Sequence, residues 1–349
     1  MLPSGTYNVR YEQSMAIIRT RAQWAMFIVF LIALFTLPLY ASRYVLSLIS
    51  TMGITLIMVQ GLGMLTGYGG LLSVGQAAFV GVGSYSCVIL IERFEVPFLI
   101  AVLCAGLSSG LVGTIFGLAV LRIKGFYLAM TTLAAQFILV WCFLHMRSWT
   151  GGTEGLFVEP ATIGGITFSS PQAKCYLILV FVVIMIYFAK NLMRTKLGRA
   201  LVAIRDNDLA AAVMGINVPA YKLIVFFICC FYAGVAGSLY AHYVGFVSPV
   251  QFTLEDSILY VGMLIVGGMG SIMGAIFGTV FMRLLNESAI YLAPIVAEMF
   301  PRFGSEIFAS LSTASYAVVI ILFLVFEPKG INHRWKILKN QYRLYPSAY

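Results

Sequence analysis

Long apolar segments recur along almost the whole chain, and they constrain its fold more than any other feature. A helix that crosses the hydrocarbon core of a bilayer needs about 20 predominantly apolar residues. Ten runs of this kind, or somewhat shorter, lie at residues 24–40, 45–65, 74–91, 96–121, 126–145, 175–192, 223–244, 258–268, 272–285 and 308–326. The pattern predicts an all-α polytopic membrane protein with about ten transmembrane helices.

The composition agrees with a lipid environment. Of the 349 residues, 61% are hydrophobic and 10% are charged, and the mean hydropathy is +0.95. A soluble domain carries about 25% charged residues, so this chain has too few to cover a surface that faces water. The first run follows a polar tail without a small-residue cleavage site, which indicates a spanning helix rather than a signal peptide. The eighth and ninth runs are short and joined through glycines, so either two spans or one span with a re-entrant segment fits them.

The basic residues predict the orientation. If the N-terminus is cytoplasmic, ten spans place both termini inside, and only six of the 22 Lys and Arg residues fall outside: Arg43, Arg93, Arg147, Lys174, Arg283 and Arg302. This bias follows the positive-inside rule. The net charge of +9 then faces anionic membrane lipid rather than a nucleic acid. We expect cytoplasmic tails at residues 1–22 and 328–349 around a permease domain at 23–327.

A cytoplasmic loop at residues 193–221 contains the pattern of a short helix of about two turns. Asp206 or Asn207 can cap its N-terminus by accepting a backbone N–H, and the segment 209–214 consists mostly of good helix formers. Gly215 suits the left-handed position that ends a helix, with Pro219 beyond it. Such a helix fits a groove on another protein, but a connector that packs only on its own chain fits equally well.

Glycines gather in three groups, which consist of Gly67, Gly69, Gly70, Gly75, Gly81 and Gly83, of Gly106, Gly110, Gly113 and Gly117, and of Gly270, Gly274 and Gly278. Small residues four apart allow helix backbones to approach closely, which is the interpretation we favour for the last two groups. The first group interrupts an apolar run and places Ser73 and Gln76 at membrane depth. Irregular backbone at that depth is tolerated where protein covers it or where it lines a cavity, so this segment is a candidate substrate path.

The fifth run adds four polar residues to that candidate path: Tyr127, Thr131, Thr132 and Gln136. Thr132 and Gln136 lie four residues apart and therefore on one face of a helix. They fit a substrate path, and hydrogen bonds to neighbouring helices fit them as well.

Ionisable residues are nearly absent from the ten runs. Arg283 and Glu327 fall near run ends, and Glu255 and Asp256 come just before the eighth run. A proton- or sodium-coupled carrier usually keeps an ionisable residue or ion site near mid-membrane, so the pattern favours an energy source on another subunit. The chain also has no GxxxxGK[ST] phosphate loop for hydrolysing ATP itself.

The sequence does not indicate an enzyme or a metal-binding protein. No paired carboxylates, histidine cluster or activated nucleophile lies at membrane depth, so we expect no catalytic residue. The cysteines sit in or beside apolar runs without CxxC spacing and are read as packing residues, and the histidines are far apart. We therefore expect no metal site and no cofactor bound by this chain.

Several longer motifs together resemble a known family. They are Gly67-Tyr68-Gly69-Gly70-Leu71-Leu72-Ser73-Val74-Gly75-Gln76, Leu121-Arg122-Ile123-Lys124-Gly125-Phe126-Tyr127, Thr150-Gly151-Gly152-Thr153-Glu154-Gly155, Gly267-Gly268-Met269-Gly270-Ser271 and Glu327-Pro328-Lys329-Gly330-Ile331. With the segment 198–219, they occur in the order found in permease subunits of bacterial branched-chain amino acid ABC importers, specifically the LivM type. The resemblance covers residues 50 to 331.

The resemblance implies partners and roles that the residues alone do not. It implies a second homologous permease, two ATPase subunits that use ATP and Mg, and a periplasmic substrate-binding protein, all at the bacterial inner membrane. It implies a type II importer-like bundle that works by alternating access. It makes the cytoplasmic helix a coupling helix that docks on an ATPase, with Arg205, Asp206, Asn207, Asp208, Ala211, Ala212 and Gly215 as coupling residues. It places Thr150, Gly151, Gly152, Thr153 and Glu154 at the outer mouth or against the binding protein, although a plain connector also fits that segment.

The substrate stays open at this level. Branched-chain or other small amino acids are the first expectation, and related permeases are thought to carry urea, short amides or aromatic acids. A stand-alone channel or facilitator is the alternative from another class, and it would need neither a coupling helix nor an ATPase.

Overall fold

The computed structural model describes residues 21–121, 126–299 and 304–344. Nearly all of this part is helical. The longer helices are α2 (Arg21–Tyr40), α3 (Arg43–Gly63), α4 (Gln76–Phe94), α5 (Phe98–Gly117), α6 (Phe126–His145), α8 (Pro171–Leu192), α9 (Lys196–Asp206), α11 (Val218–Val244), α12 (Leu254–Gly267), α13 (Ile272–Met299), α14 (Gly304–Phe326) and α15 (Ile331–Leu344). The short elements are η1 (Met64–Tyr68), η2 (Leu118–Leu121), α7 (Arg147–Thr150), η3 (Gly152–Glu154), β1 (Leu156–Phe157), β2 (Thr162–Ile163), β3 (Ile166–Thr167), α10 (Asp208–Val213), β4 (Phe246–Val247) and η4 (Pro249–Gln251).

Seven helices of the described part are long and apolar enough to cross a membrane, or eight if the bent pair α14 and α15 counts as one span. The apolar part of α2, Trp24–Tyr40, is shorter than this measure requires. Each of the ten predicted runs lies mainly in a helix of its own. The structure thus confirms a helical multi-pass chain, while the number of ten spans and the cytoplasmic side of both termini stay predictions. The outermost residues of the two predicted tails, 1–20 and 345–349, lie outside the described residues.

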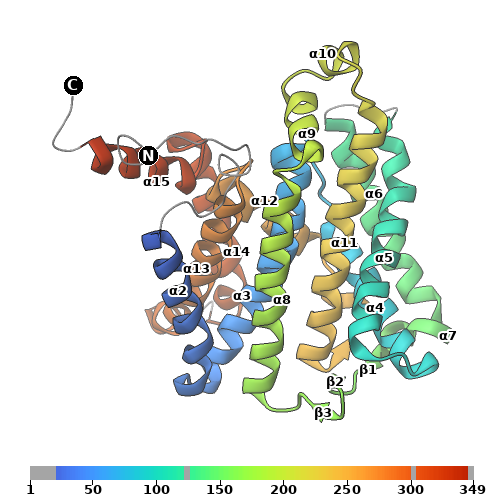
Figure 1. The fold of residues 1–349 in the computed structure, drawn as a ribbon. Coiled ribbons are helices and arrows are strands. Elements are labelled where there is room, and N and C mark those ends of the chain that lie inside the picture. The colour runs from blue at the N-terminus through green and yellow to red at the C-terminus, as the bar shows by residue number, and fades with distance from the viewer. Residues whose placement is uncertain (1–20, 122–125, 300–303, 345–349) are drawn as a thin grey trace.

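The connecting segments gather at two opposite ends of the bundle (Figure 1). Helices α9 and α10 extend beyond one end, and α7 with strands β1 to β3 lies at the other. Two small antiparallel pairings join β1 to β4 and β2 to β3, with Leu156 opposite Val247 and Thr162 opposite Thr167. This separation agrees with the sequence-based prediction that 193–221 and the loop after residue 147 lie on opposite sides of the membrane.

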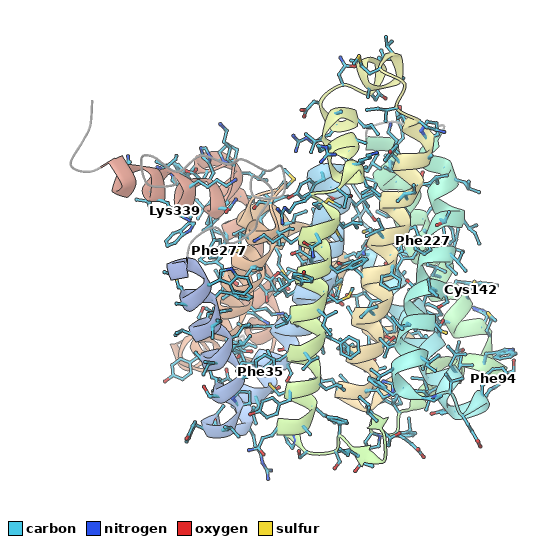
Figure 2. The ribbon with its side chains drawn as sticks, in the orientation of Figure 1. Phe35, Phe94, Cys142, Phe227, Phe277 and Lys339 are labelled. Carbon is cyan, nitrogen blue, oxygen red and sulfur yellow. The ribbon has the colours of Figure 1, made fainter. Side chains whose placement is uncertain are left out.

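Glycines set the closest helix contacts in the core. A Cβ on Gly83 of α4 would lie 2.3 Å from the backbone of Gly234 on α11, and one on Gly113 of α5 would lie 2.3 Å from the Cys230 sulfur. The Phe227 ring of α11, labelled in Figure 2, lies against Gly110 of α5. These approaches bring α4, α5 and α11 together with little space between their backbones, as the glycine spacing on α5 predicts.

Two segments outside the ten apolar runs are largely helical. Residues 286–299 form the continuation of α13 to Met299. The loop 193–221 contains a second helix, α9, whose buried residues Leu201 and Ile204 face the bundle. In the loop, α9 is amphipathic, with Leu201 and Ile204 buried and Arg199 and Arg205 exposed, so the chain forms a helix there rather than irregular structure.

Candidate functional site

The first candidate site is the break between α3 and α4. The π-helical turn η1 ends α3, and α4 begins only at Gln76 after an irregular stretch. The first N–H groups of a helix have no partner within the helix and need one from elsewhere. Here, the N–H of Ala77 donates to the Ser257 hydroxyl at 2.9 Å and that of Ala78 to Gln136 Oε1 at 2.8 Å. The N–H of Val74, just before, donates to the Thr132 hydroxyl at 3.0 Å.

The same side chains tie further segments to the break. Gln136 Nε2 donates to the carbonyl of Phe252 at 2.8 Å, and Gln76 Nε2 donates to the carbonyl of Cys229 on α11 at 3.2 Å. Gln76, Thr132 and Gln136 are all buried. Thr132 and Gln136 on α6 and Ser257 on α12 thus accept the N–H groups at the start of α4. Together with Gln76 they form a buried polar cluster that fixes the break in the middle of the bundle.

The predicted path residues therefore fall into separate groups. Ser73, next to Val74 in the chain, is also buried, and its hydroxyl has no hydrogen-bond partner among the described residues. Tyr127 lies elsewhere, 69% exposed on the outer face of α6. Thr131 is half-buried and donates to the Tyr127 carbonyl at 3.0 Å. Sequence reasoning missed Ser257, which follows two carboxylates in an otherwise apolar context and carries no motif of its own. The substrate-path role of the six residues stays a prediction.

Replacing Gln136 with Leu tests how far this cluster holds the fold. The substitution leaves the Ala78 N–H and the Phe252 carbonyl buried without partners, and each unmet group costs about 1–3 kcal/mol. We expect a drop in the unfolding temperature of the detergent-solubilised protein. Thr131→Val is the matched control, because the Thr131 hydroxyl donates to the Tyr127 carbonyl of its own helix. Equal unfolding temperatures for the two variants would show that the cluster contributes little.

The second candidate site is the cytoplasmic loop. Asn207 is the cap residue of α10, and its side chain accepts the N–H of Leu209 at 3.1 Å and of Ala210 at 3.0 Å. Gly215 has φ +84°, so it ends the helix in the left-handed conformation expected for it. Ala211 is buried, whereas three apolar side chains of α10 and its C-cap project from the loop: Leu209, Val213 and Met214, exposed by 72%, 87% and 81%.

Arg205 connects this loop to the break in the bundle. Its Nη1 donates to the carbonyl of Gly67 in η1 at 2.8 Å, and its other nitrogens hold Asp206 at 3.0 Å. Asp208 pairs with Lys222 at 3.6 Å. Gly67 in turn lies so close to Gly270, in the α12–α13 turn, that a Cβ would be 2.2 Å from its nitrogen. Direct contacts therefore connect the loop to η1 and to the α12–α13 turn.

The α14–α15 turn packs on the same place. Asn332 Nδ2 donates to the Ser271 hydroxyl at 2.7 Å, and a Cβ on Gly330 would lie 2.4 Å from the nitrogen of Gly268. Beside it, the rings of Trp335 on α15 and Phe277 on α13, the latter labelled in Figure 2, lie edge to face at 6.1 Å. The loop is thus connected through η1 to the α12–α13 turn and, through that turn, to the α14–α15 turn.

The segment predicted at the outer mouth forms a compact turn. The Thr150 hydroxyl donates to the Phe143 carbonyl at 2.6 Å, and Gly151 and Gly152 adopt positive φ. Thr153 and Glu154 are exposed. The first three residues therefore shape the turn, and the last two are available for contact with another molecule.

This arrangement defines the class of protein. A bundle of apolar helices with a broken span, polar groups fixed at its middle and a projecting loop tied to that break is typical of a membrane transport permease. The chain belongs to the family of branched-chain amino acid transport system permease components, whose family model matches residues 44–326.

Individual relatives agree. The chain is similar to the high-affinity branched-chain amino acid transport system permease protein LivM of Escherichia coli K12, with 30% identity over 286 residues, 74% of this chain and 67% of the relative. LivM of Salmonella typhimurium is 31% identical over 274 residues, 72% of this chain and 64% of that protein. The chain thus spans about two thirds of the length of these relatives. The autoinducer 2 import system permease protein LsrC of Escherichia coli K12/DH10B is 26% identical over 154 residues, 42% of this chain and 44% of the relative.

Among solved structures, the chain is similar to PsaBC from Streptococcus pneumoniae in complex with Fab. The TM-score is 0.44 at 15% identity, covering 89% of this chain and 100% of that one. A likeness at this level carries no argument about the present chain.

Proposed function

We propose that the chain is the pore-forming permease subunit of an ATP-driven importer for branched-chain or other small amino acids in a bacterial inner membrane. Family membership gives the class of protein. Helix α10 is the observation that supports an ATP-driven importer. It projects beyond the end of the bundle (Figure 1), and the apolar side chains of Leu209, Val213 and the C-cap residue Met214 are exposed. An exposed apolar cluster rimmed by charges marks a protein contact.

An importer permease of this kind has several partner proteins. Two ATPase subunits that use ATP and Mg bind at the α10 end, a second permease completes the pore, and a binding protein delivers substrate at the opposite end. The mechanism is alternating access. Closure of the ATPases moves α10, and Arg205 transmits the movement to η1 and the α12–α13 turn. Ten spans, cytoplasmic termini and a type II importer-like bundle belong to the same proposal.

The substrate assignment rests on the family and on the LivM relatives, whose names specify branched-chain amino acids. Urea, short amides and aromatic acids are the competing substrates. A channel or facilitator without ATPases is the competing class, and the apolar face of α10 disfavours it because nothing in lipid or water requires that face.

Gentle detergent purification from the native membrane, followed by mass spectrometry of the associated chains, tests the assembly. A second permease and two ATPase subunits recovered together support the importer. Repeated recovery of this chain alone in a monodisperse form supports the channel. Reconstitution of the complex with labelled leucine, urea and a short amide then tests the substrate.

Replacing Val213 with Asp tests the docking face. Val213 is the most exposed apolar residue of α10, and a carboxylate there would be desolvated in a contact with another protein. Because buried unpaired charges are costly, we expect the ATPase subunits recovered with the permease to fall about tenfold or more. Ile166→Asp, at a 68% exposed site in the hairpin at the opposite end, is the control and should retain them. Full recovery in the Val213 variant would remove α10 from the ATPase contact.

A further inference from the structure

Helix α15 concentrates positive charge just after the last apolar run. Its 14 residues include Arg334, Lys336, Lys339 and Arg343, and they include no Asp or Glu. In the whole chain only 10% of residues are charged. The side chains of Arg334, Lys336 and Lys339, the last labelled in Figure 2, are exposed. This helix therefore presents a positive surface to whatever lies beside it.

The same helix also has an apolar face. Ile331, Trp335 and Leu338 are spaced four and three residues apart, which places them on one face. Trp335 and Leu338 are each more than half exposed, so this chain does not cover them. Lys336 and Lys339 are three residues apart and lie on a different face. An apolar face with Trp and Leu beside a basic face is typical of a helix that lies in the interface of a membrane.

Helix α15 is not needed to complete the span that precedes it. Helix α14 has 23 residues, and at about 1.5 Å per residue this length crosses the hydrocarbon core unaided. The chain then bends by 48° between α14 and α15. Gly330 has φ +73° in the turn, and Arg334 forms an ion pair with Glu327 across it. The bend turns α15 away from the direction of the span, at the end of the bundle where α9 lies (Figure 1).

Two contacts fix the depth of α15. Buried Asn332 donates to the Ser271 hydroxyl at 2.7 Å, just before α13 begins. The Trp335 ring lies edge to face with that of Phe277, in the second turn of α13 and inside the ninth apolar run, at 6.1 Å. Trp335 is thus at the level where an apolar run begins, which is the level at which Trp is enriched in membrane proteins.

This depth and the charge together select the occupant of the exposed face. A partner that covers Trp335 and Leu338 has to be apolar beside Phe277, and one that meets Lys336 and Lys339 has to be negative. The boundary of a bilayer with anionic lipid has both properties, with hydrocarbon next to acidic headgroups. A water-soluble subunit matches the basic face, but it does not extend to the level of the apolar run.

We propose that α15 is an interfacial helix that binds the anionic surface of the membrane. Trp335 and Leu338 enter the boundary of the hydrocarbon, and Lys336 and Lys339 bind acidic headgroups. Because Asn332 ties the start of α15 to Ser271, binding of lipid also holds the α12–α13 turn in place. This inference goes beyond the proposed function and does not depend on the transported substrate.

The test is amide hydrogen exchange of α15, measured by mass spectrometry on the full chain in nanodiscs. One set contains phosphatidylcholine alone, and the other an equal mixture with phosphatidylglycerol, which is anionic. Basic residues near an anionic surface are attracted to it, so we expect exchange in α15 to be about tenfold slower in the anionic nanodiscs. The double variant Lys336→Gln/Lys339→Gln should lose most of this difference. Leu338→Gln should exchange faster in both lipids, since it removes apolar contact and retains a good helix former.

The control removes two positive charges from another exposed place. Lys196 and Arg199 are exposed on α9, which extends beyond the bundle, and Lys196→Gln/Arg199→Gln should keep the full lipid effect on α15. An equal loss in this variant would mean that only the total charge matters, which overturns the proposal. Wild-type exchange that is the same in both lipids overturns it as well. Protection that requires bound ATPase subunits and ignores the lipid would make α15 a protein contact. None of these outcomes bears on the importer itself, because transport is not measured.

Discussion

Replacing Arg205 with Ala should leave ATP hydrolysis largely intact while uptake falls about tenfold or more. The Arg205 guanidinium connects the end of α9 to the Gly67 carbonyl of η1 at 2.8 Å, and a charge-assisted bond of this kind contributes about 1.5–3 kcal/mol. Without it, movement of α10 no longer reaches the break directly. The measurement is the number of substrate molecules imported per ATP hydrolysed by the reconstituted complex.

Arg199→Ala is the matched control, because Arg199 lies on the same helix and its Nη1 bonds to the Arg194 carbonyl within the loop. Arg205→Lys should be intermediate, since Lys keeps the charge but not the forked geometry that reaches both Gly67 and Asp206. Loss of the ATPase subunits from the Arg205→Ala complex would make Arg205 a docking residue. If the number of substrate molecules imported per ATP hydrolysed is unchanged, contacts other than Arg205–Gly67 couple the ATPases to transport.

Local patterns predicted much of this architecture from the sequence. The cap at Asn207 and the left-handed Gly215 bracket α10 as expected, because both depend on near neighbours in the chain. The break after Gly67 was predicted as well, since glycine and polar residues interrupt an apolar run there. These features are encoded within a few residues of where they occur.

Features that depend on distant contacts were not predictable in this way. Ser257 caps α4 only because α12 begins at the depth of Ala77, and a single sequence does not give that depth. The first turn of α12, which contains Glu255 and Asp256, lies inside the candidate span Pro249–Gly267, although both residues come just before the eighth apolar run.

Close backbone contacts between α4 and α11 give the second large expected effect, on stability rather than transport. Gly237 of α11 faces the carbonyl of Val80 on α4, and an added Cβ would lie 2.0 Å from that oxygen. Backbone cannot move aside as a flexible side chain does, so the two helices must separate. We expect Gly237→Ala to destabilise the protein by about 1–3 kcal/mol or more, seen as a lower unfolding temperature in detergent and poorer recovery from membranes.

Gly63→Ala distinguishes this cause from a general intolerance of alanine at helical glycines. A Cβ there meets the end of the Leu264 side chain at 3.1 Å, which can rotate away, so the expected shift is much smaller. Gly83→Ala, whose Cβ would lie 2.3 Å from the Gly234 backbone, should behave like Gly237→Ala. If all three variants unfold at the same temperature, close backbone approach is not what fixes α4 against α11, and the spacing of glycines would be a poor guide to helix contacts in this bundle.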